Sequence, residues 1–136
     1  MPFITKQFKF CAAHKYWNDS WNHDKNYVVF GDDINVHGHN YILDITITGP
    51  IKKDSGFIYD FQKLKKIVNK NVIDILDHSQ IQKDIPWFKG KQPSTENIVV
   101  FIWEQISPRI DKPATLHKIK LRETPTIFTE YFGPGE

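Results

Sequence analysis

Apolar and polar residues alternate along four segments of the chain, and this pattern predicts four β-strands. The first two strands span 3–14 and 37–48, and the second ends at Gly49-Pro50. The last two span 116–124 and 127–132 and are joined around Pro125. The alternation predicts which residues share a face, because neighbouring side chains on a strand point to opposite sides of the sheet.

Two segments between the second and third strands have the three- and four-residue apolar spacing of amphipathic helices. The first spans 61–76 and follows Asp60, an N-cap candidate. The second begins after Ser94 or Thr95, either of which suits an N-cap, and ends before Pro108. The element order ββααββ predicts an α+β fold, an antiparallel sheet with two helices on one face.

The segment 15–36 is polar and aromatic and shows no sustained period, so it is predicted to be a long loop. Loops of this length in a small protein are usually functional. We found no internal repeat and no linker, and a chain of 136 residues is long enough for one modest core. The sequence therefore predicts a single domain over 1–136.

The composition is that of an ordinary globular protein, with 40% hydrophobic and 25% charged residues. A formal net charge of +2 and scattered lysines argue against a nucleic-acid partner. The N-terminus lacks a signal-peptide core, and no apolar run is long enough for a membrane span, so we expect a cytoplasmic protein without a membrane partner. The single Cys11 excludes an intramolecular disulfide and a multi-cysteine metal site.

Three histidines are predicted to face the apolar side of the first two strands. His37 and His39 form a His-x-His pair, and on a strand both side chains point the same way, with Gly38 between them. His14 has inward parity on the other strand. A lone inward histidine is more often a hydrogen-bonded core residue, but three together favour a metal site. Three imidazoles leave one position of a Zn²⁺ ion open, as in catalytic zinc sites.

Asp77, His78 and Glu123 are further candidates for chemistry. Asp77 can orient the neighbouring imidazole of His78, although such pairs are also common helix caps. Glu123 shares parity with the apolar residues of its strand, and an inward carboxylate needs a partner. That partner is either a basic side chain or a ligand edge with two parallel N–H donors, such as that of a pterin or guanine. His23 is predicted to lie on the surface, and His117 in the core or beside the site.

Six motifs in order resemble the 6-pyruvoyl-tetrahydropterin synthase family, which includes the 6-carboxy-tetrahydropterin synthases of queuosine biosynthesis. The motifs are "FCAAH", "VHGHNY", "GFIYDFQKLK", "LDH", "PSTENIVVFIWEQI" and "LRET", and the resemblance extends from about Phe8 to Tyr131. It implies the tunnelling fold (T-fold), in which three subunits close their sheets into a barrel and two trimers stack as a homohexamer. It also implies that sites lie between subunits.

The resemblance assigns roles to matching positions. His14, His37 and His39 would hold the zinc ion, Asp77 and His78 would handle protons, and Glu123 would anchor the pterin, with Thr95 and Glu96 lining the pocket. The implied substrate is 7,8-dihydroneopterin triphosphate, whose side-chain hydroxyls the zinc would chelate and acidify. Loss of the triphosphate or scission of the side chain would follow.

Asp33 stands where family members that make the pyruvoyl or carboxy product carry a cysteine base. Cys11 is predicted to face away from His14 and so cannot easily replace it. An aspartate has a reference pKa near 3.9 against about 8.5 for a thiol, so it needs burial or the like charge of Asp32 to become a useful base. Relatives with glutamate there resemble enzymes that cleave the side chain to 6-hydroxymethyl-7,8-dihydropterin for folate synthesis. The alternative is that "GDD" is a solvated acidic turn.

Three functional hypotheses follow. The first is a zinc-dependent lyase acting on a pterin triphosphate, with side-chain cleavage favoured if Asp33 is the base. The second is a pterin- or purine-binding metal protein that has lost turnover together with the cysteine. The third is a hydrolase that uses zinc-bound hydroxide on an unrelated substrate, for which a Glu123→Ala change would matter little.

Overall fold

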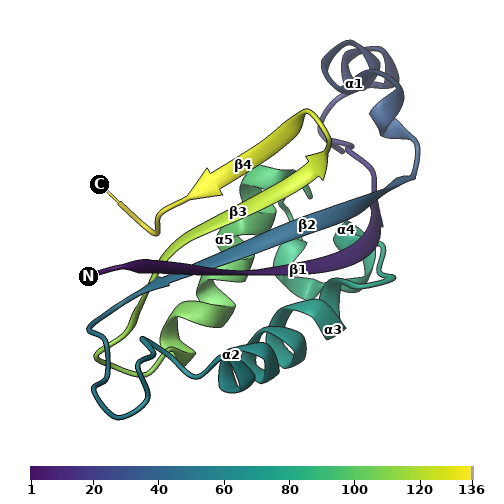
Figure 1. Cartoon of the computed structure of the whole chain (residues 1–136). Coiled ribbons are helices and arrows are strands. Elements are labelled where there is room, and N and C mark those ends of the chain that lie inside the picture. The colour runs from purple at the N-terminus through teal and green to yellow at the C-terminus, as the bar shows by residue number, and fades with distance from the viewer. Residues whose placement is uncertain (136) are drawn as a thin grey trace.

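One antiparallel sheet with the strand order β1-β2-β3-β4 forms the centre of the protein, as a computed structural model describing residues 1–135 shows (Figure 1). The strands are β1 (Phe3–His14), β2 (His37–Thr48), β3 (Thr115–Thr124) and β4 (Ile127–Tyr131). They agree with the predicted strands to within one residue at each end. The helices after β2 cover one face of this sheet (Figure 1), so the predicted α+β fold is confirmed.

The helices form where the apolar spacing predicts them. The predicted helix 61–76 is a continuous helical stretch of α2 (Phe61–Val68), a π-helical turn (Asn69–Ile73) and α3 (Asp74–Leu76). The long second helix is α5 (Thr95–Ile106), and the hydroxyl of Ser94 caps it by accepting a hydrogen bond from the amide of Asn97. Between them lie the short helix α4 (Ile81–Asp84) and 3₁₀ turns at Pro86–Phe88 and Ser107–Arg109.

The core lies between the sheet and these helices. Alternate residues of β2 are at most 1% exposed, and they pack with buried residues of α2 and α5 such as Leu64 and Ile102. Burying one such side chain contributes about 1.5–3 kcal/mol to stability. This row on β2 also sets the direction of His37 and His39, which continue it at the start of the strand.

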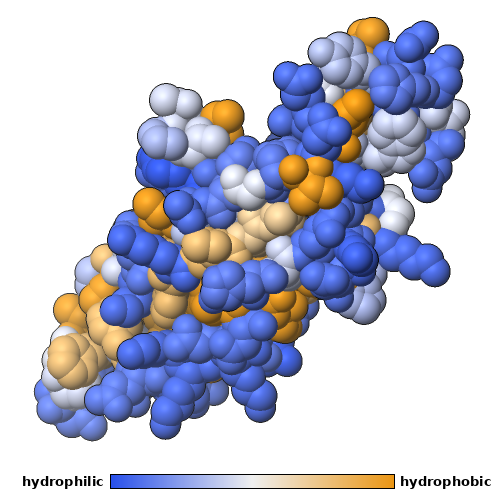
Figure 2. Space-filling view, turned by 90° about the vertical axis from the view of Figure 1, so that its right-hand side faces the viewer, coloured by the Kyte–Doolittle hydropathy of each residue, from blue (hydrophilic) through white to orange (hydrophobic). Residues whose placement is uncertain are grey.

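The predicted loop 15–36 contains the helix α1 (His23–Phe30), which the sequence analysis missed. Its only buried residue is polar: the amide of Asn26 donates to the backbone carbonyls of Asn18, Trp21 and Asn22. Apolar residues that would form a buried face at helical spacing are therefore missing from α1. It projects from the rest of the protein (Figure 1), and the side that carries it is mostly hydrophilic with scattered hydrophobic spots (Figure 2). An Asn22 N-cap signal precedes it.

A β-bulge on β3 moves His117 away from its predicted position. Lys118 pairs with Thr46 and Leu116 with Ile47, so His117 is one extra residue on its strand and the alternation shifts there. Its ring stacks on Phe3 with centroids 4.3 Å apart, and Phe3 lies at the opposite end of β1 from His14. His117 is thus neither a core residue nor a neighbour of the candidate site. No helix within residues 1–135 is long and apolar enough to cross a membrane.

Candidate metal centre

His14, His37 and His39 converge at one end of the sheet. His14 is the cross-strand partner of His37 in the β1–β2 register, and His39 follows two residues later on the same face. The ring centroids lie 4.6 Å apart for His14 and His37 and 5.1 Å apart for the other two pairs. One ligand atom from each histidine lies within 4.8 Å of the others, so the group can hold a metal ion.

Backbone carbonyls orient two of the three rings. His14 Nδ1 lies 2.8 Å from the carbonyl oxygen of Pro93, and His37 Nδ1 lies 2.8 Å from that of Asn35. Because a carbonyl can only accept, Nδ1 carries a proton in both rings, and in the neutral imidazole Nε2 then keeps its lone pair. His14 Nε2 is buried and has no hydrogen-bond partner. An orphaned lone pair beside two other imidazoles is the donor set that zinc prefers.

The surroundings favour the neutral form of His14 and His39, which is the form that binds metals. Burial, together with the nearby His37 and His39, lowers the pKa of His14 to about 4, although the hydrogen bond that its Nδ1–H donates to the Pro93 carbonyl acts in the opposite direction. Burial, followed by the charge of His37, also lowers the pKa of His39. At neutral pH both side chains are therefore available as ligands.

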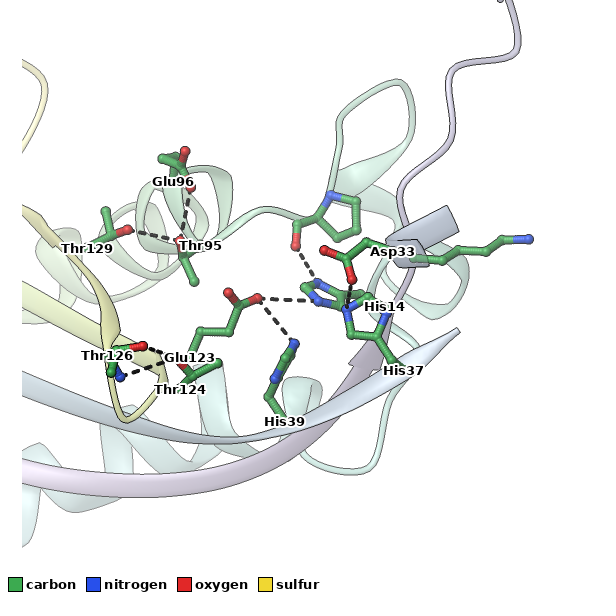
Figure 3. Close-up of polar contacts among 12 residues, drawn as sticks. His14, Asp33, His37, His39, Thr95, Glu96, Glu123, Thr124, Thr126 and Thr129 are labelled. Atoms are coloured by element: carbon green, nitrogen blue, oxygen red, sulfur yellow. Dashed lines mark hydrogen bonds and ion pairs between the residues drawn. The ribbon is translucent and has the colours of Figure 1, made fainter. Parts of the chain in front are cut away.

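Glu123 on β3 points its carboxylate at the histidines (Figure 3). Its Oε1 atom lies 3.3 Å from His14 Nε2 and 3.4 Å from His39 Nε2, and its side chain is only 12% exposed. Burial raises the pKa of Glu123, and the negative charges of Asp33 and Glu96 raise it further. Glu123 also lines a hollow of about 610 Å³ together with His39, Arg122 and Pro125, which is large enough for a small-molecule ligand.

Asp33 approaches the cluster from the other side. It lies on the 3₁₀ turn Gly31–Ile34 that follows α1, and its Oδ1 atom is 3.6 Å from His37 Nε2. Its backbone carbonyl accepts a hydrogen bond from the amide of Tyr16, which fixes the turn against the end of β1. The side chain is half exposed but faces the histidines (Figure 3), unlike the side chain of a purely solvated turn.

Thr95 and Glu96 lie at the N-terminus of α5, beside Glu123 (Figure 3). The buried hydroxyl of Thr95 donates to Glu96 Oε1 at 2.9 Å and lies 2.9 Å from the hydroxyl of Thr129 on β4. These contacts hold Glu96 at the rim of the site. The negative charge of Glu96 is close enough to help raise the pKa of Glu123.

Asp77 and His78 do not join this cluster. Their segment runs along the free edge of β1: Asp77 Oδ1 accepts from the amide of Cys11, and the amide of His78 donates to the Cys11 carbonyl. His78 has a φ of 61°, an uncommon value for a residue other than glycine, and its side chain is 82% exposed. His78 Nδ1 lies 3.6 Å from Asp77 Oδ2. The His78 imidazole faces solvent here, and a hollow of about 370 Å³ beside it is also lined by Cys11 and His39.

Two tyrosines at the site were missed. The Tyr41 hydroxyl is buried without a hydrogen-bond partner, and its ring meets those of His14 and His39 edge-on. Tyr16 lies over His14 with centroids 5.0 Å apart. Burial, followed by the charge of Glu123, raises the pKa of both hydroxyls, so both stay protonated. Strand parity with His39 was the signal for Tyr41, whereas Tyr16 lies beyond the end of β1.

Comparisons with known proteins agree with this arrangement. A family model described as 6-pyruvoyl tetrahydropterin synthase matches residues 3–134. The 6-pyruvoyl tetrahydrobiopterin synthase of Dictyostelium discoideum is 35% identical over 96% of this chain and 95% of its own length. The structure of the Caenorhabditis elegans 6-pyruvoyl tetrahydropterin synthase superimposes with a TM-score of 0.89, 32% identity and 98% coverage of both chains.

A third relative carries a different name. The dihydroneopterin monophosphate aldolase of Pyrococcus furiosus is 32% identical over 88% of this chain and 88% of its own length. The fold is thus the T-fold that the sequence motifs imply. The chain belongs to the 6-pyruvoyl tetrahydropterin synthase family and is, like its relatives, a lyase that processes pterins.

Proposed function

We propose that this protein is a zinc-dependent lyase that acts on 7,8-dihydroneopterin triphosphate. The observation that carries the proposal is the meeting of three imidazoles with the inward carboxylate of Glu123 at one end of the sheet. His14, His37 and His39 would hold the Zn²⁺ ion. Zinc bound there would act as a Lewis acid and lower the pKa of a substrate hydroxyl group.

Glu123 would anchor the substrate by accepting two hydrogen bonds from the amino-amide edge of the pterin ring. Thr95 and Glu96 lie beside Glu123 (Figure 3) and would line the pocket. The anchored ring would hold the side chain over the histidines, so that the reacting carbons lie within reach of Asp33. Positioning of this kind lowers the barrier by removing motional freedom before the reaction.

Asp33 would act as the base in place of the family cysteine, and this favours side-chain cleavage. Asp33 would take the proton of the second side-chain hydroxyl, and the bond between the first and second side-chain carbons would break. The electron pair would pass into the pterin ring, and the first carbon would regain a proton, giving 6-hydroxymethyl-7,8-dihydropterin and a two-carbon aldehyde triphosphate. The aldolase name of the Pyrococcus furiosus relative supports this product.

Asp77 and His78 would supply the returning proton, although they lie on the edge of β1 and face solvent. Exposed in one chain, the pair would serve the metal site of a neighbouring chain in an oligomer. The left-handed backbone of His78 supports a functional role, since such conformations cost free energy and concentrate at functional sites. The homohexamer and the cytoplasmic location stay predictions.

A product assay tests this function. Zinc-loaded protein is incubated with 7,8-dihydroneopterin triphosphate and the pterins are separated by chromatography, and 6-hydroxymethyl-7,8-dihydropterin is expected to accumulate. A matched Asp33→Cys variant is expected to shift the product towards the 6-pyruvoyl compound. Unchanged substrate after long incubation, with the pterin bound, would contradict this proposal and favour a pterin-binding protein without turnover.

A further inference from the structure

A hollow of about 490 Å³ lies where β1 ends, between the loop 15–20 and the segment 88–92. We call it the lysine hollow, because three of the side chains that line it are Lys15, Lys89 and Lys91. Among residues 1–135, the acidic side chain in this lining is that of Asp19. The lining therefore carries an excess of positive charge, which attracts an anionic ligand.

The protein does not neutralise these lysines itself. Within residues 1–135, the lysines that take part in ion pairs are Lys63 and Lys118. Lys91 is held in place by uncharged groups: its Nζ atom donates to the backbone carbonyl of Trp87 at 3.2 Å and lies 3.8 Å from the centroid of the Trp87 ring. These contacts leave the positive charge of Lys91 in place, and an ammonium group has two further N–H donors for a ligand.

A tight turn places Lys89 and Lys91 in one wall of the lysine hollow. The amide of Lys91 donates to the carbonyl of Phe88 at 2.9 Å, and Gly90 has a φ of 78°. Lys89 has a φ of −59° and a ψ of 121°, so residues 88–91 form a type II turn, which favours glycine at its third position. Phe88 is buried and fixes the turn to the core, so both lysines are presented by a rigid segment.

Two glutamine side chains fix the opposite wall. Gln82 Oε1 accepts a hydrogen bond from the amide of Lys15 at 3.2 Å. Gln92 Oε1 accepts from the amide of Trp17 at 3.2 Å, and Gln92 Nε2 donates to the carbonyl of Trp17 at 2.8 Å. These bonds join the two walls, so the lysine hollow is formed before a ligand binds. A preformed site saves the free energy of ordering its walls on binding.

The walls of the lysine hollow continue directly into the metal centre. Lys15 follows His14, and the carbonyl of Pro93, the residue after the second wall, lies 2.8 Å from His14 Nδ1. The amide of Tyr16 donates to the carbonyl of Asp33 at 2.9 Å. The same two segments therefore border both the hollow and the groups proposed to act on the substrate side chain.

A second hollow of about 520 Å³ has a different charge. It is lined by Lys52, but also by Asp54 and Asp60. Its carboxylates outnumber its lysine, so an anion is less favourable there. Charge thus singles out the lysine hollow as the place for an anionic ligand.

We propose that the lysine hollow binds a chain of phosphate groups, with Lys15, Lys89 and Lys91 as the cations that contact it. Lysine is a common phosphate-binding residue in proteins. The inference rests on the proposed function, because it gives the triphosphate of the proposed substrate a place to bind. Its consequence is that the lysine hollow selects phosphorylated over unphosphorylated pterins and takes no part in bond cleavage.

Binding of inorganic triphosphate tests the site itself. Isothermal titration calorimetry compares the zinc-loaded wild type with the double variant Lys89→Gln/Lys91→Gln. Hydrogen bonds to charged groups typically change affinity by about tenfold or more each, so the double variant is expected to bind at least about tenfold more weakly. Lys65→Gln/Lys66→Gln, which removes the same charge from the exposed surface of α2, is the matched control and should bind as the wild type does. Circular dichroism verifies that each variant is folded.

The variant His37→Ala separates the lysine hollow from the metal, because triphosphate also binds zinc directly. This variant is expected to lose zinc and to keep the triphosphate affinity of the wild type. Loss of triphosphate binding in His37→Ala, together with unchanged binding in Lys89→Gln/Lys91→Gln, would assign the phosphate to the metal and overturn the inference.

Kinetics distinguish the substrate tail from a free polyphosphate as the occupant. If the triphosphate of the substrate binds there, Lys89→Gln/Lys91→Gln should raise KM for 7,8-dihydroneopterin triphosphate by at least about tenfold and leave kcat unchanged. KM for unphosphorylated 7,8-dihydroneopterin should stay the same in this variant. Inorganic triphosphate should compete with the phosphorylated substrate in the wild type. Lysine-dependent triphosphate binding without this competition would support the site and assign it to a free polyphosphate.

The outcomes also separate this inference from the proposed function. Equal triphosphate affinity and equal KM in the wild type, Lys89→Gln/Lys91→Gln and the control would overturn the inference while the proposed function stands. Lysine-dependent triphosphate binding in a protein that converts no pterin would support the inference and overturn the proposed function alone.

Discussion

The three histidines and the Asp77–His78 pair are both candidates for catalysis, but they occupy different places in the sheet. The histidines lie on the inner face of two paired strands, and backbone carbonyls and a carboxylate surround them. Asp77 and His78 lie on the outer edge of β1, with the imidazole of His78 exposed. One group is assembled within a single chain. The other lies outside the cluster, and His78 shares only an open hollow with His39.

The comparison also separates what the two groups contribute to stability. His14 is fully buried, and His37 and His39 continue the row of β2 residues whose parity buries the apolar side chains. The Asp77–His78 segment stabilises the edge of β1 through backbone hydrogen bonds and the Asp77 carboxylate. The imidazole of His78 takes no part in these contacts. Changes to the His78 side chain are therefore expected to affect activity and not folding.

Replacing His37 by Ala gives the largest expected effect. His37 is a proposed zinc ligand but is only partly buried, so the variant is expected to fold. Zinc content should fall from about one ion per chain to nearly none, and kcat/KM should fall by at least about 10³-fold, because a Lewis acid supplies several kcal/mol. Elemental analysis and the product assay check both values. His23→Ala, at the exposed start of α1, is the control, and equal loss in both variants would contradict the assignment.

Replacing His78 by Ala is expected to lower kcat by about 10²–10⁴-fold, the usual contribution of a general acid or base, without loss of zinc. The comparison is sharpened by coexpressing this variant with His37→Ala. Mixed oligomers should regain activity if His78 serves the metal site of a neighbouring chain. Mixtures that stay inactive, although gel filtration shows that they assemble, would contradict the proposal that His78 serves the metal site of a neighbouring chain.

Acidification is expected to destabilise the metal-free protein through the buried cluster. Burial lowers the pKa of His14 from 6.5 to about 4, so between these values the unfolded chain binds a proton that the folded chain does not. The free energy of unfolding should therefore fall as the pH drops from 6.5 to 4, by about 3 kcal/mol at most. Urea unfolding compares the wild type with His14→Gln, and parallel curves for the two would contradict this expectation.

The smallest effect is expected for Tyr41→Phe. The Tyr41 hydroxyl is buried without a partner, so its removal should change the free energy of unfolding by less than about 1 kcal/mol. Thr95→Val is the contrast, because the Thr95 hydroxyl contacts both Glu96 and Thr129, and its loss should cost about 1 kcal/mol or more. A large destabilisation by Tyr41→Phe would reveal a partner for that hydroxyl.

Strand periodicity predicted the inner face of the site but not its outer parts. His14, His37, His39 and Glu123 lie on the predicted face, because alternation on a strand is a local property. The helix α1 was missed because Asn26 replaces the expected apolar row, and His117 was misplaced because a bulge shifts the alternation. The separation of His78 from the cluster depends on backbone pairing with β1, for which side-chain patterns carry no signal.

Anomalous diffraction from crystals of the zinc-loaded protein at the zinc absorption edge tests the central claim most directly. The account predicts one strong peak per chain, at bonding distance from the Nε2 atoms of His14, His37 and His39. A peak elsewhere, or three rings that diverge around an empty space, would contradict it.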